Sequence, residues 1–287
     1  TLCSTILGKR RAYQCIRQFR GHLNIIIIMS IKNTYYYFKE ALSPDQCQKI
    51  IDMGEQRIGE VKKEGRSADA TTYGNNQKQA FEKIGKKVIP QADKTNEELK
   101  EEIGKDKDIE QERYVRDSEV CWFNDNWLYD LIHPFLRTAN EKAGWKYQWD
   151  FSEAFQFTKY NKGGFYGWHA DGNSCHFGKY KRHIPGVSPT TPDGLPLRGY
   201  STNANMIGKV RKLSITINLN EPGEYDGGNL KFDFGPHASG KRFHEVEEIR
   251  PQGSIIVFPS YVYHQVTPVT RGTRYSLVLW SLGQPFK

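Results

Sequence analysis

The chain is poor in cysteine, and none of its cysteines lies in a zinc-binding pattern. The five are Cys3, Cys15, Cys47, Cys121 and Cys175, an odd number at wide spacing with no CxxC pair. Closely spaced cysteine pairs mark disulfide scaffolds and structural zinc sites. Their absence argues against both classes of protein and favours a reducing compartment, so we expect a cytoplasmic location.

Long hydrophobic runs are also missing. The run after Asn24 has only five apolar residues, too few for the core of a signal peptide or for a membrane span. We therefore expect no membrane association. The segment before Met29 is basic, unpatterned and begins without Met. We expect residues 1–28 to precede the true start or to form a disordered extension, and residues 1–34 to lie outside the core.

No dense stripe of one charge occurs, although the net charge is +8. Such a charge permits acidic partners without requiring them, so nucleic acid is not the expected partner. Residues 58–118 are rich in lysine and glutamate, and the mixed-sign run over 96–112 predicts a solvated helix or a mobile loop. We expect residues 35–150 to form a charged, helical region that packs on the core.

Two helices are predicted within that region. Ser43, Pro44 and Gln46 supply an N-cap, a first-turn proline and a capping box, for a helix that should run to about Arg57. Residues 127–143 carry large apolar side chains at helical spacing, which predicts a helix packed on a sheet.

The C-terminal half predicts short strands separated by turns. Residues 213–219 alternate between aliphatic and polar side chains, and the polar side, which includes Thr216, would face a cofactor cavity. Residues 253–259 form a nearly all-apolar run, residues 230–234 and 275–280 read as further strands, and 224–229 as a turn. Short strands at this spacing favour a jelly-roll sandwich, a mainly β fold with flanking helices.

The most informative residues are His169, Asp171, His264 and Arg274. On an extended chain, positions i and i+2 face the same way, so His169 and Asp171 can reach one ion together. Two imidazoles and one carboxylate form the facial triad that holds non-heme Fe(II) and leaves coordination positions open. Arg274 begins a predicted strand nearby, and its planar guanidinium suits a carboxylate ligand. These residues together suggest an Fe(II)- and 2-oxoglutarate-dependent oxygenase.

The remaining histidines and arginines have simpler interpretations. His22, His133, His237 and His244 are expected to be structural, and His176 and His183 to be solvated. Arg271, a turn residue, is expected to be exposed. Residues 172–208 are rich in Gly, Pro, Ser and Thr and follow the candidate ligands directly. They could form a lid that binds substrate or a disordered insertion, and the sequence favours neither.

Five ordered segments carry a resemblance to a known family. They are Tyr160–Asp171, Arg211–Asn220, Tyr225–Leu230, Val257–Ser260 and His264–Arg274. With them, the chain from about Glu153 to Gly283 resembles the prolyl 4-hydroxylase-type 2-oxoglutarate/Fe(II) oxygenases, and especially the PKHD-type hydroxylases.

The resemblance implies a double-stranded β-helix over residues 151–287 and assigns roles within it. His169, Asp171 and His264 would bind iron, and Arg274 would bind the C5 carboxylate of 2-oxoglutarate. Tyr160 or Tyr166 would hydrogen-bond that carboxylate. The implied reaction hydroxylates a C–H bond, in a prolyl or lysyl residue of a peptide or protein, and gives succinate and CO2. Ascorbate would be an optional reductant.

Two other functions remain open on the sequence. AlkB-type nucleic-acid demethylases of the same superfamily carry a second arginine six residues after the first, where this chain has Trp280. A cupin-like module or hydrolase with another metal would use the three ligands but would leave Arg274 without a role.

Overall fold

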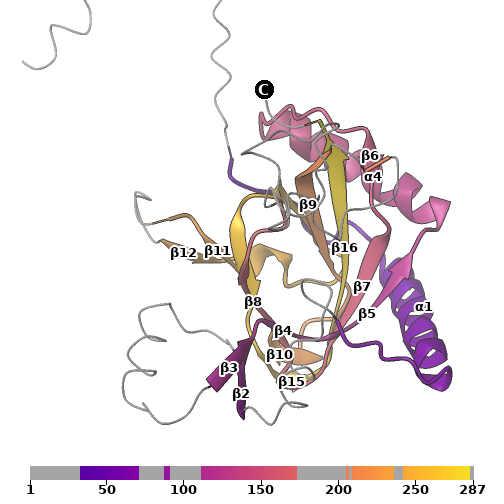
Figure 1. Cartoon of the computed structure of the whole chain (residues 1–287). Coiled ribbons are helices and arrows are strands. Elements are labelled where there is room, and N and C mark those ends of the chain that lie inside the picture. Colours follow the sequence, from indigo (N-terminus) through magenta and orange to yellow (C-terminus); the bar gives the residue numbers. More distant parts are fainter. Residues whose placement is uncertain are drawn as a thin grey trace, which may run out of the picture. The chain divides into compact units, whose positions relative to one another are not determined.

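The computed structural model describes residues 33–70, 87–90, 111–172, 205–206, 209–235 and 242–284 (Figure 1). The chain divides into two compact units, Thr1–Ile31 and Lys32–Lys287, and everything described belongs to the second. Several predictions therefore lie outside the described residues. These concern residues 1–28, His22, His176, His183, His237, most of the charged region 58–118 and most of the candidate lid 172–208.

Two antiparallel sheets form the body of the fold. In the larger sheet the strands follow the order β1–β13–β9–β16–β7–β5, and β6 adds to β16. Their bounds are Tyr36–Phe38, Ile255–Pro259, Val210–Asn218, Arg274–Gly283, Phe155–Tyr160, Glu119–Phe123 and Phe151–Ser152 (β6). The smaller sheet has the order β12–β11–β14–β8–β4. Its strands are Phe243–Glu245, Leu230–Asp233, Tyr263–Val266, Phe165–His169 and Arg116–Asp117.

Eight of these strands make a jelly roll. Along the chain, β7, β9, β13 and β16 join the larger sheet, whereas β8, β11, β12 and β14 join the smaller one. The chain thus passes from sheet to sheet and returns to pair strands that are distant in sequence, the double Greek key of this architecture. The predicted double-stranded β-helix is confirmed. Short pairs also form between β10 (Tyr225–Gly227) and β15 (Val269–Gly272), and between β2 (Lys87–Pro90) and β3 (Gln111–Tyr114).

The alternation of β9 separates the core from the site. Leu213, Ile215 and Ile217 are fully buried in the main apolar cluster, together with residues of both described helices. Each such side chain contributes roughly 1.5–3 kcal/mol by leaving water. The polar residues between them face the space between the two sheets, because successive side chains on a strand point to opposite faces. The predicted strand with its aliphatic side in the core is confirmed, and the cofactor cavity expected beside its polar side stays a prediction.

The two described helices, α1 (Pro44–Lys63) and α4 (Asn126–Lys142), pack on this apolar face. The predicted capping box is present: Ser43 Oγ accepts from the Gln46 N–H, and the Gln46 side chain accepts from the Ser43 N–H. Helix α1 runs six residues beyond the predicted end at Arg57. The extension includes Gly59, a poor helix former, but also Glu60, and it ends in Lys62 and Lys63, whose charge suits a helix C-terminus.

One local prediction was wrong. Residues 224–229, predicted as a turn, contain β10, because β15 offers a partner far away in sequence that no local pattern reveals. His264 follows β13 along the chain and lies within strand β14.

Candidate metal centre

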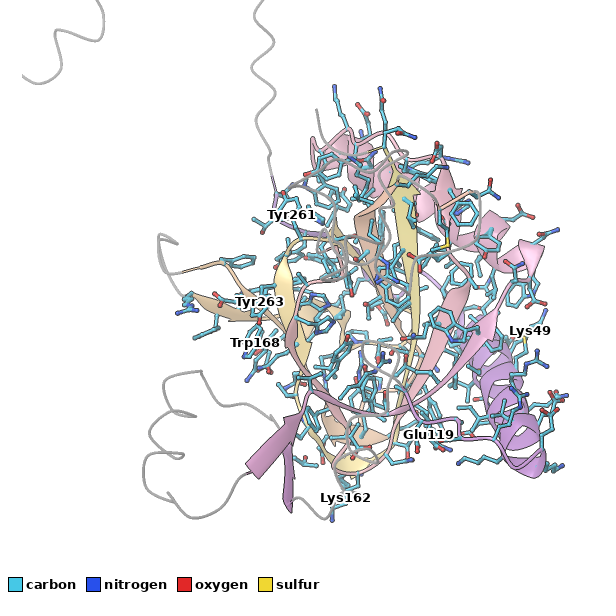
Figure 2. The ribbon with its side chains drawn as sticks, viewed as in Figure 1. Lys49, Glu119, Lys162, Trp168, Tyr261 and Tyr263 are labelled. Atoms are coloured by element: carbon cyan, nitrogen blue, oxygen red, sulfur yellow. The ribbon has the colours of Figure 1, made fainter. Side chains whose placement is uncertain are left out.

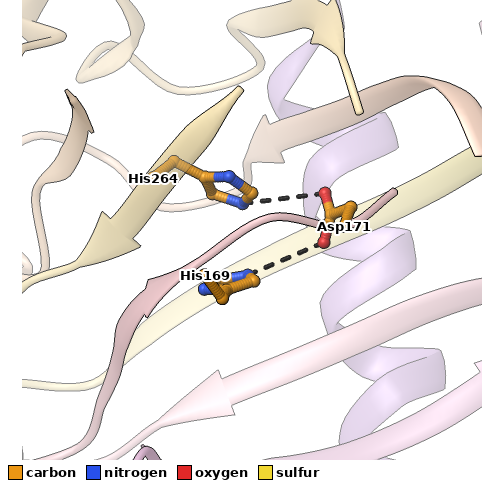
Figure 3. A group of neighbouring side chains, drawn as sticks. All are labelled: His169, Asp171 and His264. Carbon is orange, nitrogen blue, oxygen red and sulfur yellow. Dashed lines mark ion pairs between the residues drawn. The ribbon is translucent and has the colours of Figure 1, made fainter. Parts of the chain in front are cut away.

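The two histidines come from neighbouring strands of the smaller sheet. His169 ends β8 and pairs directly with His264 of β14. Asp171 follows β8 by two residues, and Gly172 holds that turn by donating its N–H to the Ser260 carbonyl at 2.7 Å. Figure 3 shows the three side chains converging. Two strand neighbours and one turn residue therefore bring together ligands that lie far apart in the sequence.

The spacing of the three side chains suits a single ion. Nε2 of His169 and Nε2 of His264 each lie 3.6 Å from a different oxygen of Asp171. All three candidate ligand atoms lie within 4.8 Å of one another. Two ligands bonded to one ion at about 2.1 Å can be no more than about 4.2 Å apart, so each nitrogen–oxygen pair meets that limit.

Hydrogen bonds fix the orientation of both imidazoles. Nδ1 of His169 lies 2.7 Å from the Gly167 carbonyl, and Nδ1 of His264 lies 2.9 Å from the Val262 carbonyl. A carbonyl can only accept, so each Nδ1 carries the proton and each Nε2 keeps its lone pair for a ligand. Such partners beyond the ligands are what hold metal-binding histidines in position.

The charge state of the cluster also suits a cation. Burial and the nearby His169 together lower the pKa of His264 to about 4, against the opposing effect of Asp171. Burial alone would raise the pKa of Asp171, but His264, His169 and the Arg211 guanidinium outweigh it and hold the pKa well below its usual range. At neutral pH, His264 is therefore a neutral ligand and Asp171 an anionic one.

Tyr166 packs against the first histidine. A bulge in the pairing of β8 with β14 inserts one extra residue between Tyr166 and His169. Positions i and i+3 of a strand normally face opposite sides, but here both rings share one side and stack 3.5 Å apart at 14°. The Arg116 guanidinium lies over the ring of Tyr166, 4.6 Å from its centroid. Tyr166 thus supports the plane of His169 and is itself in contact with Arg116.

A buried ion pair lies beside the carboxylate ligand. Arg211 of β9 donates to both oxygens of Glu153, at 2.6 and 2.7 Å. Its remaining nitrogen donates to the backbone carbonyl of Asp171 at 3.4 Å. The same guanidinium lies 3.9 Å above the ring of Trp280. Sequence reasoning did not assign Glu153 or Arg211 a function, because the two residues meet only in the folded sheet.

Arg274 is a buried cation without a counter-ion in the described structure. The side chain is 2% exposed, and its Nε and Nη1 atoms have no hydrogen-bond partner among the described residues. Tyr160 is its cross-strand neighbour on β7, and its ring lies 5.4 Å from the guanidinium carbon. A buried, unpaired guanidinium is costly, so this arrangement calls for an anionic ligand.

The structure separates the two candidate tyrosines and places the other predicted residues. Tyr160 lies beside Arg274, whereas Tyr166 lies against His169. Thr216 is buried on β9, between Ile256 and Val278 in the sheet. Arg271 is exposed, as predicted, and pairs with Asp226 at 2.6 Å.

The other described histidines have structural partners. His133 bonds to Ser152 at 3.1 Å, and His244 bonds to Tyr35 at 2.9 Å. Within the described residues, the only His, Cys, Asp and Glu side chains gathered closely enough for a metal ion are His169, Asp171 and His264.

Comparison with protein families supports the relationship that this geometry suggests. Residues 155–282 match the model of the 2OG-Fe(II) oxygenase superfamily. This part of the chain, somewhat under half of it, is similar to that superfamily. The matching segment runs from β7 to β16 and so contains all three candidate ligands and Arg274.

The curated proteins similar to this chain include PKHD-type hydroxylases. One from Nitrobacter winogradskyi is 34% identical over 128 residues, which cover 44% of this chain and 42% of the relative. One from Burkholderia ambifaria is 33% identical over 99 residues, covering 34% and 35% of the two chains. The chain thus matches less than half the length of these relatives.

Solved structures similar to this chain include prolyl hydroxylases. A Pseudomonas putida prolyl-4-hydroxylase has a TM-score of 0.47 and 17% identity, with 88% of this chain and 94% of that chain covered. A Trichoplax adhaerens prolyl hydroxylase, solved with a peptide fragment of hypoxia inducible factor, has a TM-score of 0.47 and 12% identity, with 87% and 84% covered.

The superfamily implies Fe(II) and 2-oxoglutarate, and the residues present fit both. The donor set of two neutral imidazoles and one carboxylate is the one that suits Fe(II) with open positions. The unpartnered guanidinium of Arg274 fits the far carboxylate of a dicarboxylic acid.

Proposed function

We propose that this protein is an Fe(II)- and 2-oxoglutarate-dependent dioxygenase that hydroxylates a C–H bond of a prolyl or lysyl residue in a peptide or protein. Succinate and CO2 would be the accompanying products, and ascorbate could serve as a reductant. The observation that carries the proposal is the buried, unpaired Arg274 in the same domain as the His169–Asp171–His264 cluster. The choice of a prolyl or lysyl residue rests on the resemblance of the sequence to prolyl 4-hydroxylases and PKHD-type hydroxylases.

Each residue would have a separate task. His169, Asp171 and His264 would hold Fe(II), which with 2-oxoglutarate and O2 supplies the oxidising power. Arg274 would bind the C5 carboxylate bidentately, with Tyr160 beside it and Thr216 on the polar wall of the cavity. Tyr166 and the Glu153–Arg211 pair would keep the ligands in position and keep water from the buried site.

Two rival functions are less consistent with the structure. A cupin-like module or hydrolase without 2-oxoglutarate gives no reason for an unpaired buried Arg274. A nucleic-acid demethylase of the AlkB type would carry an arginine where Trp280 stands, and Trp280 packs against Arg211.

Among the described helices, none is long and apolar enough to cross a membrane.

The proposal is tested by adding 2-oxoglutarate to the anaerobic, Fe(II)-loaded protein and recording the visible metal-to-ligand charge-transfer band. We expect the band in the parent protein and its loss in His169→Ala. Arg274→Lys should keep the iron but require much more 2-oxoglutarate, because an ammonium cannot reproduce the bidentate contact. A folded, metal-loaded parent that shows no band would contradict the proposal and favour the cupin-like module.

A further inference from the structure

The larger sheet has an open edge beside helix α1, on the side of β5 that faces away from β7. Residues before β5 cover the first part of this edge. Val120 donates its N–H to the Ala68 carbonyl at 2.8 Å, and Ala70 donates to the Ser118 carbonyl at 2.8 Å. Glu119, labelled in Figure 2, marks this covered end. Backbone groups of an antiparallel strand alternate between its two sides, so Trp122 presents its N–H and C=O on the same side as Val120.

At Trp122 the edge is uncovered. Nothing in the described part of the chain bonds to its outward N–H or C=O. Its indole is 47% exposed, one of the most exposed large apolar side chains of the described structure. An edge strand with unpaired backbone groups is a template for another strand. Trp122 therefore offers both a backbone pairing site and an aromatic contact.

Two adjoining cavities turn this edge into a groove. One, of about 530 Å³, is lined by residues of α1, by residues 66–69 and by Arg116 and Gln156. The second, of about 430 Å³, continues along α1 toward Asp125. Both are lined by Arg57, Glu60 and Trp122. The groove thus follows the open edge of β5, with α1 as its opposite wall. Figure 1 shows α1 beside β5.

The groove leads to residues that surround the candidate metal ligands. The ring of Trp122 lies 6.1 Å from that of Trp280, which packs beneath Arg211 beside Asp171. At the inner end, Arg116 bonds to Gln156 at 2.8 Å and covers Tyr166, the partner of His169. A chain in the groove would therefore run past the residues that pack around the metal centre.

We propose that an extended peptide segment of the substrate pairs with the open edge of β5 at Trp122 and lies in the groove beside α1. The proposal rests on the proposed function, since it names how the peptide substrate of that reaction is held. An extended peptide is the occupant because its backbone satisfies the N–H and C=O of Trp122 together. Its alternate side chains would contact the indole and the charged side chains of Arg57 and Glu60, which line both cavities. Main-chain pairing would tolerate varied sequences around the target residue.

The test compares two substitutions at one position. Trp122→Ala removes the ring and keeps the backbone N–H, whereas Trp122→Pro removes both. Proline is tolerated on an edge strand where the N–H faces outward. Tyr37→Ala is the control, because Tyr37 is 42% exposed on β1, the opposite edge strand of the same sheet. The melting temperature establishes that each variant is folded, and the charge-transfer band establishes that it binds Fe(II) and 2-oxoglutarate.

The probes are two pools of short synthetic peptides, with central proline or central lysine and randomised flanks. We expect a pool to slow hydrogen exchange at the Trp122 amide and to be hydroxylated by the parent. Trp122→Ala should raise KM for the pool roughly tenfold, as loss of an aromatic anchor does. Trp122→Pro should raise it by a further factor of about three to ten, for the lost hydrogen bond. Tyr37→Ala should leave KM unchanged.

Other results overturn strand addition in recognisable ways. Equal KM values in the alanine and proline variants, with hydroxylation intact, would reject the edge and leave the proposed function standing. A normal charge-transfer band together with peptide pools that neither bind nor react would also reject the edge and leave the proposed function standing. Protection of the Trp122 amide without any pool would mean that the edge is already occupied. If that protection grows with protein concentration, the occupant is a second copy; if not, it is another part of this chain. Only loss of the band in the parent would reject the proposed function itself.

Discussion

At the scale of single residues, the position of Arg274 depends on the absence of a side chain at Gly228. A Cβ at Gly228 would lie 2.7 Å from Cδ of Arg274 and 3.1 Å from Cγ2 of Val269. The backbone there has φ +60°, a conformation that glycine adopts at little cost. The turn between β10 and β11 therefore leaves space for the Arg274 guanidinium because residue 228 has no side chain.

We expect Gly228→Ala to displace Arg274 and to weaken 2-oxoglutarate binding roughly tenfold or more, a loss comparable to one charge-assisted contact. Titration of the charge-transfer band measures this affinity, and iron binding should be unchanged. Gly223→Ala is the control, since Gly223 also has positive φ (+96°) but no atom within 4 Å of the added methyl. Equal losses in the two variants would attribute the effect to backbone strain and not to crowding of Arg274.

The Glu153–Arg211 pair gives a second prediction at this scale. Its side chains are 8% and 11% exposed, so Glu153→Gln would leave a buried guanidinium without its counter-ion. We expect a loss of roughly 3 kcal/mol in the free energy of unfolding, measured by urea denaturation.

The exposed pair of Arg271 and Asp226 serves as the matched control, because its nitrogen–oxygen distance is also 2.6 Å but its side chains are 59% and 54% exposed. Asp226→Asn should change stability little, because solvent screens an exposed pair. Similar losses in the free energy of unfolding at the two pairs would show that burial does not determine how much the Glu153–Arg211 pair stabilises the fold.

At the scale of elements, helix α1 forms one wall of the groove and its start is fixed by the capping box. Removing the Ser43 hydroxyl leaves the Gln46 N–H without its partner. We expect Ser43→Ala to lower the free energy of unfolding by about 1 kcal/mol, and Ser43→Asp to restore it, because aspartate is an equally good cap. Urea denaturation of the three proteins measures the difference, and an unstable aspartate variant would argue against capping as the cause.

The same helix is tied to the larger sheet through Glu55. Its carboxylate accepts hydrogen bonds from Lys159 of β7, at 2.9 Å, and from the Tyr275 hydroxyl of β16. Burial alone would raise the pKa of Glu55, but these two hydrogen bonds outweigh it and lower the pKa below its ordinary value. A group with a lowered folded-state pKa stabilises the fold above its unfolded-state pKa, and that stabilisation is lost as the pH falls through the folded-state pKa.

We therefore expect the parent to be more stable than Glu55→Gln at about pH 6, and the difference to shrink as the pH falls to about 3. The free energy of unfolding of both proteins, measured across this range, tests the sign. A difference that stays constant would mean that the ionised carboxylate contributes nothing.

At the scale of the whole molecule, a bound ion would join two strands of the smaller sheet to the turn after β8. An ion that binds only the folded state stabilises it by mass action, by about 2.7 kcal/mol at about 100 times its dissociation constant. We expect Mn(II), which fits the same ligands without redox chemistry, to raise the melting temperature, and a chelator to reverse the rise.

His264→Ala should abolish the effect of Mn(II). His133→Ala provides the comparison, because His133 is half-buried and bonds to Ser152 but lies outside the cluster. It should lower the melting temperature and keep the shift caused by Mn(II). A shift that survives in His264→Ala would place the ion elsewhere.

The elements whose signals are local in sequence could be predicted. The alternation over 213–219 and the capping residues around Ser43 each depend on neighbours along the chain, and both are confirmed. The end of α1 could not be placed, because Gly59 looks like a stop signal after Arg57 but lies inside the helix, which ends before Gly65 with its φ of +72°. The approach of His169 and Asp171 was predicted because their i and i+2 spacing in a strand context is visible in the sequence. The approach of His264 was expected only from the resemblance to the oxygenase family, because it depends on the pairing of β8 with β14.

Features that depend on pairing between distant strands could not be predicted. The bulge that brings Tyr166 onto His169 exists only in the register of β8 with β14. The Glu153–Arg211 pair and the open edge at Trp122 also follow from which strands become neighbours. Trp168 and Tyr263, labelled in Figure 2, stack 5.9 Å apart for the same reason. Sequence patterns give each strand its two faces but do not say which strand will lie beside it.

The direct pairing of His169 with His264 has a consequence for how the protein is assembled. A slip of one residue between β8 and β14 would turn the imidazole of His264 to the opposite face, because side chains alternate along a strand. A misaligned chain could still be compact, but it would not hold the ion. Retention of the metal would then distinguish molecules with correctly aligned strands from misfolded molecules of similar size.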